Sequence, residues 1–414
     1  MAEDIEPISF ANEDVLACPY DAYETLLADA PVYKDPGTGS YIVSRYEDVR
    51  AILLDPKRFS SEGYLNAITD TVLAERAERM RALYRERGWL PDPALGFIDD
   101  PRHRDIRAVF ERAFRAGRIK AMEPQIRDIA YQLADRLATL GSCDFVAEFA
   151  VPLPLHVTGL ITGVPTEDLE KIRIWTDAFI RRFGLMISEE EERECVLLEI
   201  EAQHYLRALI EKLRATPEDS LLSDLVNTPL SEGTTLSDNA LLAHLMADTF
   251  VGGSETTTSA LASGLRLLCQ HPGLYAKVRA DPDTLLRPFI EEVLRLESPV
   301  QGLYRVATED VVLHGQTIPA ASVINLRYAA ANRDDRHFGC PAALDVERRN
   351  SGSHLAFGSG IHHCVGATLA RRELYWGFRS ILERCGPITL AEANDFSHAP
   401  SLMLRRLAAL HIEL

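Results

Sequence analysis

The sequence predicts an α-rich α+β protein: mainly helical, with minor β sheets. Long stretches carry apolar residues at i, i+3 and i+4, which is the period of an amphipathic helix. Only short runs alternate between apolar and polar residues, as half-buried strands do. Pro and Gly are scattered instead of being gathered into a linker, so we expect one compact domain over residues 1–414.

The helical period defines most of the predicted elements in chain order. The predicted helices are Asp21–Ala30, Arg102–Arg115, Ile119–Leu140, Thr166–Phe183, Glu189–Ala215, Asp238–Gln270, Asp283–Leu296 and Val365–Arg384. The predicted strands are Ser40–Ser44, Tyr304–Ala307, Val311–Leu313 and Ala408–Leu414.

The helix Asp238–Gln270 is unusually long and contains Gly252-Gly253 in its middle. Each glycine costs about 1 kcal/mol relative to alanine in a helix interior. The threonines at 256–258 follow, and their hydroxyls compete for backbone partners. Two interpretations stay open at this point: a helix that makes room for a ligand, or a harmless kink.

Composition and charge narrow the class of protein. The chain is 46% hydrophobic, which is ample for a large core, and its formal charge is −18. So acidic a chain lacks the basic footprint of a nucleic-acid-binding protein. The amino terminus has no basic n-region or apolar h-region, and no stretch approaches 18 uninterrupted apolar residues. We therefore expect a cytoplasmic monomer that binds neither nucleic acid nor membrane.

The seven cysteines form no C-x-x-C pair, and we expect free thiols instead of a disulfide framework. Cys364 stands apart because of the string around it, Phe357-Gly358-Ser-Gly360-Ile-His-His-Cys364-Val-Gly366. The two glycines at 358 and 360 allow positive φ and close approach to a flat ligand. The helix that begins just after Cys364 favours a thiolate, and Phe357 can shield the sulfur from water. The alternative is a buried thiol in a Gly-rich turn.

The pattern Phe357-Gly358-x-Gly360-x-His362-x-Cys364-x-Gly366 resembles the haem-binding loop of the cytochrome P450 family. Further motifs follow the family's order, so the resemblance spans most of the chain. It implies the cytochrome P450 fold, with haem b between the long central helix and the cysteine-loop helix, and Cys364 as the iron ligand. A thiolate ligand favours O–O cleavage. The resemblance therefore implies a monooxygenase that inserts one oxygen atom of O2 into a small hydrophobic substrate.

The segment Gly252-Gly253-Ser254-Glu255-Thr256 resembles the oxygen-activation segment of the same family. Cleavage of the O–O bond needs protons at the outer oxygen, and a carboxylate and a hydroxyl can relay and hold them. We expect Glu255 and Thr256 to be catalytic and Gly252 to open a groove beside the haem. The alternative is that Glu255 and Thr256 only satisfy a distorted helix.

Glu292 and Arg295 share a helix face at i, i+3 and can form an ion pair. The resemblance places this pair behind the haem, joined by Arg348, which fits the spacing of a Pro-x-x-x-Asp stretch at 341–345. Buried pairs with an extra partner fix a structure more plausibly than they do chemistry. We therefore interpret the three residues as structural.

The resemblance also assigns four basic residues to the two haem propionates, which need charge-assisted hydrogen bonds when they are buried. His103 and Arg107 are i, i+4 on one predicted helix face. Arg305 starts a predicted strand, and His362 lies two residues before Cys364.

The chain has no G-x-G-x-x-G fingerprint after a strand, so its electrons must come from another protein. The resemblance to bacterial members of the family implies a [2Fe–2S] ferredoxin and its reductase. A basic segment that could receive an acidic ferredoxin is present. It contains Arg102, Arg104, Arg107, Arg112, Arg115, Arg118 and Lys120.

Substrate contacts are the least specific part of the sequence. Asp248 and Val251 share a face of the central helix with Glu255. Asp248 either binds a polar group of substrate or faces solvent or an ion pair. The resemblance adds pocket walls from Ala67–Phe97, Trp175–Met186, Pro400–Met403 and Val300–Leu303, the last including Val300, Gln301 and Leu303. The mostly apolar walls predict a terpenoid, aromatic or steroid-sized substrate.

Two other functions remain compatible with parts of the pattern. A haem sensor or carrier without turnover would share the Cys364 loop, but it needs no proton relay at Glu255 and Thr256. A protein that uses Cys364 as a redox thiol without haem would need neither the Glu292–Arg295 pair nor the propionate set.

Overall fold

The computed structural model describes residues 6–64 and 71–414, in which helices dominate and the sheets are small, as predicted. The chain divides into two compact units. Unit 1 comprises Met1–Ser60, Pro124–Leu153 and Thr256–Leu414, and unit 2 comprises Ser61–Glu123 and Pro154–Glu255. That the whole chain acts as one catalytic domain stays a prediction.

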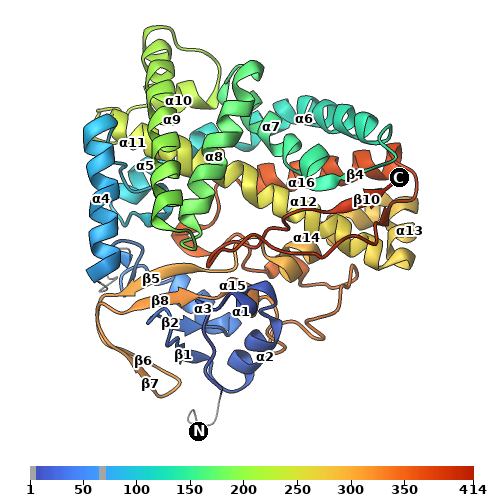
Figure 1. Cartoon of the computed structure of the whole chain (residues 1–414), viewed down its shortest axis with the longest axis horizontal. Helices are drawn as coiled ribbons and strands as arrows, with labels where there is room; N and C mark the ends of the chain where they lie inside the picture. Colours follow the sequence, from blue (N-terminus) through green and yellow to red (C-terminus); the bar gives the residue numbers. More distant parts are fainter. Residues whose placement is uncertain (1–5, 65–70) are drawn as a thin grey trace. The chain divides into compact units, whose positions relative to one another are not determined.

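Unit 1 contains the main sheet, which has the strand order β1-β2-β8-β5-β3 (Figure 1). Strands β2 and β8 are parallel, and the other neighbours are antiparallel. The register pairs Arg305 with Ile324 of β8, while the short strand β3 pairs with the next two residues of β5, Val306 and Ala307. The strands are β1 (Val32–Lys34), β2 (Tyr41–Val43), β3 (Phe59–Ser60), β5 (Leu303–Ala307) and β8 (Val323–Leu326).

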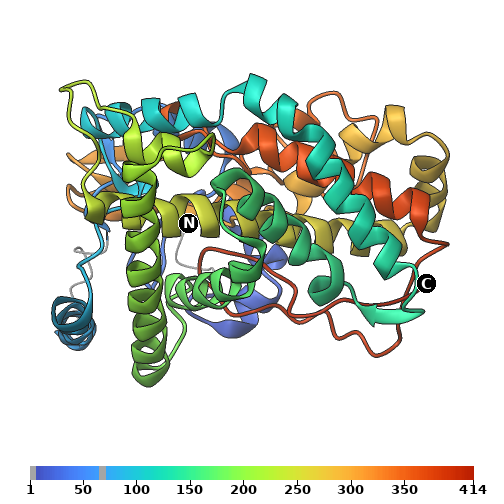
Figure 2. The ribbon, with the colours of Figure 1, turned by 90° about the horizontal axis from the view of Figure 1, so that it is seen from above.

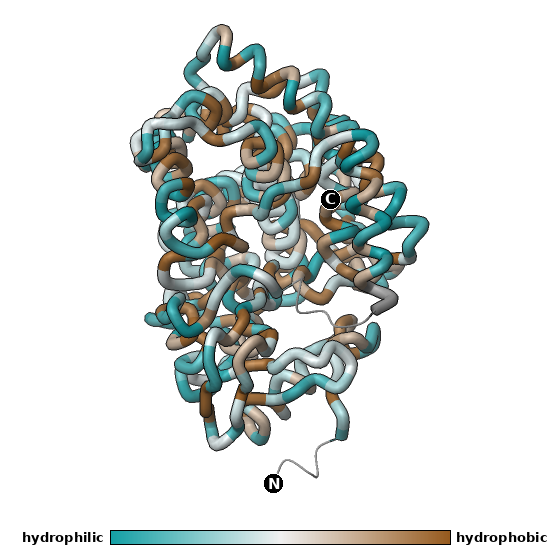
Figure 3. The backbone as a smooth tube through the Cα atoms, turned by 90° about the vertical axis from the view of Figure 1, so that its left-hand side faces the viewer, coloured by the Kyte–Doolittle hydropathy of each residue, from teal (hydrophilic) through white to brown (hydrophobic). Residues whose placement is uncertain are grey.

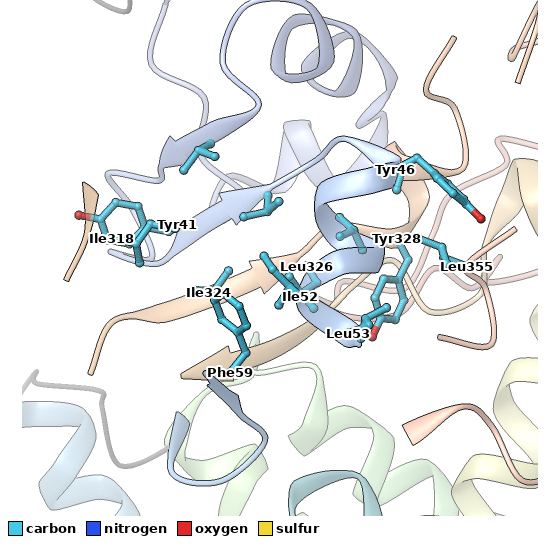
Figure 4. Packing of buried hydrophobic residues seen from close by; sticks show 14 of the residues in the cluster. Tyr41, Tyr46, Ile52, Leu53, Phe59, Ile318, Ile324, Leu326, Tyr328 and Leu355 are labelled. Carbon is cyan, nitrogen blue, oxygen red and sulfur yellow. The ribbon is translucent and has the colours of Figure 1, made fainter. Parts of the chain in front are cut away.

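A hydrophobic core joins this sheet to helix α3 (Tyr46–Leu53). Figure 4 shows Ile52 and Leu53 of α3 packed near Leu326 of β8 and near Tyr328. All four side chains are almost completely buried, and burial of this kind contributes about 1.5–3 kcal/mol for each large apolar side chain. The chain entering the Cys364 loop joins the same core through Leu355.

The rest of unit 1 consists of helices and two small sheets. The helices are α1 (Glu13–Ala17), α2 (Tyr20–Ala28), η3 (Val146–Ala150), α13 (Pro272–Ala280), α14 (Pro282–Glu297), α15 (Tyr328–Ala331), η6 (Ser351–Ser353), η7 (Gly360–His362) and α16 (Ala367–Arg384). The small sheets are β4-β10-β9, from β4 (Ser142–Asp144), β9 (Thr389–Leu390) and β10 (His411–Glu413), and β6-β7, from β6 (Val311–Leu313) and β7 (Gln316–Ile318).

The described part of unit 2 is helical. Its core includes Met80 and Tyr84 of α4 packed against Val196 and Ile200 of α9. Teal and brown alternate along the tube of individual helices in Figure 3, as expected for helices with one apolar face. The helices are α4 (Thr71–Arg87), η2 (Leu95–Phe97), α5 (Arg102–Ala113), η4 (Thr166–Asp168), α8 (Leu169–Phe183), α9 (Glu189–Ala215), α10 (Leu221–Asn227), α11 (Asp238–Ala243) and η5 (His244–Val251).

Three helices run from one unit into the other along the chain: α6 (Ala116–Leu137), α7 (Pro152–Thr162) and α12 (Gly252–Gln270). The predicted long helix is the continuous run of α11, η5 and α12, seen in yellow in Figures 1 and 2. Its distortion is real but lies earlier than expected. The π-helical turn occupies His244–Val251, and regular α-helix resumes at Gly252. A wide turn of this type often marks a functional site.

Among the described residues, no helix is both long and apolar enough to span a membrane.

Candidate active site

The loop before α16 depends on two glycines. Gly358 has φ +66° and Gly360 has φ +69°, in the left-handed region that side chains disfavour. A Cβ at position 360 would also lie 2.3 Å from the carbonyl oxygen of Leu53, so a larger residue would displace α3 or the loop. The amide of Cys364 donates to the carbonyl oxygen of Phe357 at 2.9 Å and closes the loop.

The closed loop presents Cys364 at the surface, just before the amino terminus of the 18-residue helix α16. The amides and dipole of that helix end favour a thiolate there. By contrast, burial raises the pKa of the Cys269 thiol to about 12 and that of Cys385 to about 11. Those two sulfurs pack as neutral groups, and Cys364 differs from them in both exposure and electrostatics.

A hydrogen-bonded group that the sequence analysis missed lies behind the loop. Arg371 of α16 donates to Glu291 of α14 through Nε (2.6 Å) and Nη2 (2.9 Å). The same guanidinium lies 4.5 Å from the ring centroid of Phe357. Glu291 thus fixes Arg371, and Arg371 covers the aromatic residue whose carbonyl receives the Cys364 amide.

His354 links the same carboxylate to the entry of the loop. Its Nδ1 accepts the amide hydrogen of Ala356 at 3.2 Å, so Nε2 carries the proton that is donated to Glu291 at 3.1 Å. The amide of Leu355 donates to Oδ1 of Asn332 at 2.6 Å. Burial opposes ionisation of Glu291, but hydrogen bonds from Arg371 and His354 outweigh it and lower its pKa to about 2.

The expected ion pair on α14 is present. Arg295 donates to Glu292 through Nε (2.6 Å) and Nη2 (2.9 Å), and both side chains are fully buried. Arg348 Nε lies 3.1 Å from the same carboxylate. Arg295 also donates to the backbone carbonyls of Asn332 (3.0 Å) and Pro341 (2.7 Å). The pair therefore joins α14 to the segment that precedes the Cys364 loop.

The surroundings of Arg305 show whether unit 1 offers a partner for the haem that the resemblance implies. It is 4% exposed, and its Nη1 donates to the carbonyl of Tyr304 at 2.7 Å. Within residues 6–64 and 71–414, no carboxylate lies within ion-pair distance of it. A buried guanidinium without a carboxylate needs an anionic partner to offset its desolvation. A haem propionate is such a partner, so Arg305 fits the cofactor.

The four predicted propionate residues belong to different units. Arg305 and the half-buried His362 lie in unit 1. His103 and Arg107 lie on one face of α5 in unit 2. Burial, followed by the charge of Arg107, lowers the pKa of the His103 imidazole. Arg107 pairs with Glu111 at 2.7 Å and keeps donors of its fork available.

The acid and the threonine of the central helix lie in the first turns of α12. Glu255 is buried at 5% exposure, Thr256 is half-buried, and Gly252 is exposed one turn earlier. An exposed glycine in a helix interior leaves backbone accessible that a side chain would otherwise cover. A carboxyl and a hydroxyl on consecutive residues beside such a gap can hold and move protons.

The predicted pocket residues have unequal surroundings. Val251 is buried, whereas Val300 and Leu303 are partly buried against the α3–sheet core. Gln301 is held inside unit 1. Its Oε1 accepts from Tyr23 at 2.6 Å, and its Nε2 donates to backbone carbonyls at 2.6 and 3.1 Å. The side-chain amide of Gln301 therefore forms hydrogen bonds that stabilise the fold of unit 1.

Asp248 is held by hydrogen-bond partners within unit 2. Its Oδ2 lies 2.7 Å from Nδ1 of His244 and also accepts the amide hydrogen of Leu95 at 2.9 Å. His244 lies one helical turn before Asp248 on the same predicted helix face, whereas the bond to Leu95 could not be predicted because Leu95 is remote in the chain. Part of the predicted wall Ala67–Phe97, residues 67–70, lies outside the described residues.

Comparison with known proteins agrees with this geometry. The family model described as Cytochrome P450 matches residues 176–407. The cytochrome P450 monooxygenase PikC of Streptomyces venezuelae is 35% identical over 97% of this chain and 92% of PikC. Vitamin D(3) 25-hydroxylase of Pseudonocardia autotrophica is 33% identical over 86% of this chain and 83% of its own length. The crystal structure of P450BioI with a hexadec-9Z-enoic acid ligated acyl carrier protein has a TM-score of 0.85 and 28% identity, covering 98% of this chain and 100% of that one.

Proposed function

Because this chain belongs to the cytochrome P450 family, we propose that it hydroxylates or similarly oxidises a hydrophobic organic substrate with electrons from a [2Fe–2S] ferredoxin and its reductase. The chain is a cytochrome P450 monooxygenase, binds haem b and uses O2. The observation that carries the proposal is the Cys364 loop: two positive-φ glycines and the Phe357 carbonyl hold a surface thiol at the start of α16.

Bound haem supplies the iron at which O2 is activated. Cys364 would donate its thiolate sulfur to that iron, and donation of this kind favours O–O cleavage. The Phe357 carbonyl accepts the Cys364 amide, a Cβ at position 366 would lie 3.8 Å from the sulfur, and the start of α16 would stabilise the negative charge of the thiolate. Glu292, Arg295 and Arg348 would keep the loop in register from behind.

Glu255 and Thr256 would transfer and hold protons during the reaction. We assign Glu255 to transfer protons from solvent and Thr256 to hold a proton at its hydroxyl. Gly252 would leave space beside them. His103, Arg107, Arg305 and His362 would bind the propionates by charge-assisted or neutral hydrogen bonds. Val251, Val300 and Leu303 would contribute apolar contacts to substrate.

The ferredoxin proposal is supported by uncompensated positive charge. Arg104, Arg112, Arg115 and Lys120 are exposed, and none of them forms an ion pair with a residue that the structure describes. They lie within 17 residues of a chain whose net charge is −18. Such a surface would attract an acidic iron–sulfur protein through long-range steering.

Rapid-mixing kinetics test this surface. Arg112→Glu and Arg115→Glu should each slow reduction by a [2Fe–2S] ferredoxin about tenfold at low salt, with the difference shrinking as salt rises. Lys277→Glu makes the same charge change on the exposed face of α13 and should leave the rate unchanged. Equal rates for all variants would remove the docking proposal without affecting the monooxygenase.

The hydrophobic substrate class is supported by the apolar residues Val251, Val300 and Leu303 and by the names of two relatives. One is a vitamin D(3) hydroxylase, and another was crystallised with a fatty acyl group on its carrier protein. Sterols, terpenoids and free fatty acids should therefore be screened for a low-to-high spin change. Compounds that produce the change are then incubated with ferredoxin, reductase, reduced nicotinamide cofactor and O2.

The proposal requires a product heavier than the substrate by one oxygen atom, with the added atom derived from O2. Cys364→His should retain haem but lose the thiolate-type Soret band of the reduced CO complex and should lose turnover. A thiolate-type band together with no product from any spin-shifting compound would argue against the proposed substrate class. A histidine-type band in the unaltered protein would argue against Cys364 as ligand.

A further inference from the structure

Six polar side chains of unit 1 form a cluster that the proposed function does not use. Glu297 and Arg405 are 5% and 7% exposed, and the Arg266 side chain is 12% exposed. The six come from the start of α2, the second half of α12, the end of α14, the chain after α15 and the C-terminal segment: Tyr20, Arg266, Glu297, Arg333, His398 and Arg405. We call this set the Tyr20 cluster.

Contacts with Tyr20 hold the cluster together. The guanidinium carbon of Arg333 lies 4.1 Å from the centroid of the Tyr20 ring, and that of Arg405 lies 5.3 Å from it. Nη2 of Arg266 lies 3.0 Å from Oε1 of Glu297. Burial, followed by the charge of Glu297, raises the pKa of the Tyr20 hydroxyl, and the charges of all three arginines oppose that rise. The charged groups thus surround one neutral phenol.

His398 adds a second neutral ring from the C-terminal segment. Burial, followed by the charges of Arg405 and Arg266, lowers the pKa of its imidazole to about 3, so the ring is uncharged at pH 7. With both rings neutral, three guanidinium groups face a single carboxylate. Two positive charges of the cluster are therefore not balanced by its own residues.

Backbone carbonyls supply only part of what the arginines need. Nη1 of Arg405 donates to two carbonyls at the end of α1, both at 3.1 Å, and Nη2 of Arg333 donates to one at the end of α14 at 3.0 Å. In the described part of the chain, Glu297 is the only carboxylate within ion-pair distance of any of the three arginines. Buried cations need an anionic partner to offset their desolvation, and carbonyls carry no net charge.

Three donors of the cluster indicate which kind of anion would fit. Nε of Arg266, Nε of Arg405 and the hydroxyl of Tyr20 are shielded from solvent and have no hydrogen-bond partner among the described residues. An oxyanion is bound best by two parallel bonds from one guanidinium edge. On Arg266 that edge is already shared with Glu297, through Nη2. Single N–H and O–H donors from separate residues suit a spherical monovalent ion better.

We propose that the Tyr20 cluster binds one small monovalent anion of the size of chloride, with Nε of Arg266, Nε of Arg405 and the Tyr20 hydroxyl as donors. The ion would balance one of the two excess charges and would link the start of α2 to α12 and to the C-terminal segment. Its effect would be on the stability of unit 1, independent of the reaction at Cys364. A water molecule on the same donors is the competing arrangement, and it would leave both charges unbalanced.

Bromide is a suitable probe, because it can replace chloride and is located directly by anomalous diffraction. Crystals of the haem-loaded protein in bromide should show an anomalous peak within hydrogen-bonding reach of Nε of both Arg266 and Arg405. The proposal is overturned if the cluster has no such peak, including the case in which bromide is found only elsewhere on the protein.

Chemical unfolding measures the ion in solution with a readout other than haem. Urea midpoints from far-UV circular dichroism are compared in sodium chloride and in sodium gluconate, a bulky anion, at equal ionic strength, so that screening is the same. Chloride should raise the midpoint until the gain saturates. At about ten times its dissociation constant, chloride should lower the unfolding equilibrium constant about tenfold. Equal midpoints in the two salts would mean that the cluster holds water and would refute the anion.

A conservative variant tests the hydroxyl donor. Tyr20→Phe keeps the ring that contacts Arg333 and Arg405 but removes the O–H, so chloride should bind about tenfold more weakly. Tyr375→Phe makes the same change in a tyrosine whose ring centroid also lies near a guanidinium, 5.7 Å from that of Arg287. This control should keep the chloride dependence of the unaltered protein.

Glu297→Gln gives a result of opposite sign. It removes the partner of Arg266, so the protein should be less stable in gluconate, yet chloride should bind about tenfold more tightly because a competing negative charge is gone. Glu347→Gln removes an exposed carboxylate and should change neither quantity. A purely structural role for Glu297 would lower the midpoint equally in both salts. That result, or an unchanged chloride dependence in Tyr20→Phe, would overturn the proposal.

Discussion

Replacement of Glu291 by glutamine should destabilise the Cys364 loop, and the size of the effect follows from the pKa of Glu291. The pKa of Glu291 falls from 4.5 to about 2, which corresponds to about 3 kcal/mol in favour of the ionised form in the folded protein. Its side chain is 18% exposed, so solvent screening removes little of this energy. Because the folded pKa is depressed, the contribution is complete above pH 4.5 and is lost as the pH falls toward 2.

The variant keeps the size of the side chain but loses the charge that binds Arg371 and His354. At pH 7 the urea midpoint for loss of the thiolate-type Soret band should fall by about 1 M or more. The midpoint is the appropriate measure, since unfolding of a cofactor protein is not strictly two-state. Glu170→Gln breaks an exposed i, i+3 pair with Arg173 and should shift the midpoint by a small fraction of that. Equal midpoints for Glu291→Gln and the unaltered protein would refute the assignment of Glu291 to the loop.

Three further changes follow from contacts in the described chain. Gly360→Ala should reduce the haem-to-protein ratio at purification severalfold, because the new Cβ meets the Leu53 carbonyl and φ is positive. Arg305→Met should speed transfer of haem to an excess of apo-globin by about tenfold or more, since it would remove the buried cation that we propose as the partner of a propionate. Glu199→Ala should destabilise unit 2 by about 3–5 kcal/mol in chemical unfolding, because it leaves Arg182 and the hydroxyl of Tyr84 without their buried carboxylate.

Matched variants separate these effects from general damage. Gly386→Ala meets no atom within 4 Å and has no positive φ, so full haem content is expected. Arg349→Met changes an exposed arginine and should leave haem transfer unchanged. Glu211→Ala removes an exposed carboxylate of the same helix as Glu199 and should alter unfolding by less than about 1 kcal/mol. If a variant and its control gave the same haem content, transfer rate or unfolding free energy, the role assigned to the corresponding contact would be wrong.

Local pattern accounts for what the sequence predicted well. Glu189–Ala215 was predicted to the residue from its long amphipathic run, and the structure adds a capping box at Ser188 and Glu191 that sets its start. The pair Glu292 and Arg295 could also be predicted from local sequence, because residues three positions apart lie on the same helix face. Helices α4 and α7 were not predicted. The first has an apolar stripe interrupted by many charged residues, and the second is apolar on most sides, so neither shows a strong period.

Contacts between residues far apart in the sequence are the part of the candidate site that could not be predicted. The Cys364 loop could be recognised because its glycines, phenylalanine and cysteine are adjacent in sequence. The residues that hold it could not, since Arg371 reaches Glu291 across 80 positions and His354 reaches it across 63. Asp248 was singled out as a carboxylate on the same face of the central helix as Val251, yet its partner Leu95 is 153 positions away. Sequence patterns thus found the reacting groups better than the groups that orient them.

Two carboxylates, Glu291 and Asp248, whose remote partners only the structure identifies, perform related tasks in different units. Glu291 organises the backbone around the predicted iron ligand, and Asp248 organises the turn that carries Phe97. Each carboxylate accepts hydrogen bonds from two donors, and one of the two donors is a histidine. The side chains of both histidines are less than 2% exposed. A buried histidine that donates to a carboxylate fixes the carboxylate's rotamer, and a fixed rotamer can in turn fix a backbone amide or a guanidinium. Loss of the Glu291 carboxylate should therefore appear first as altered haem spectra, before any change in the amount of folded protein.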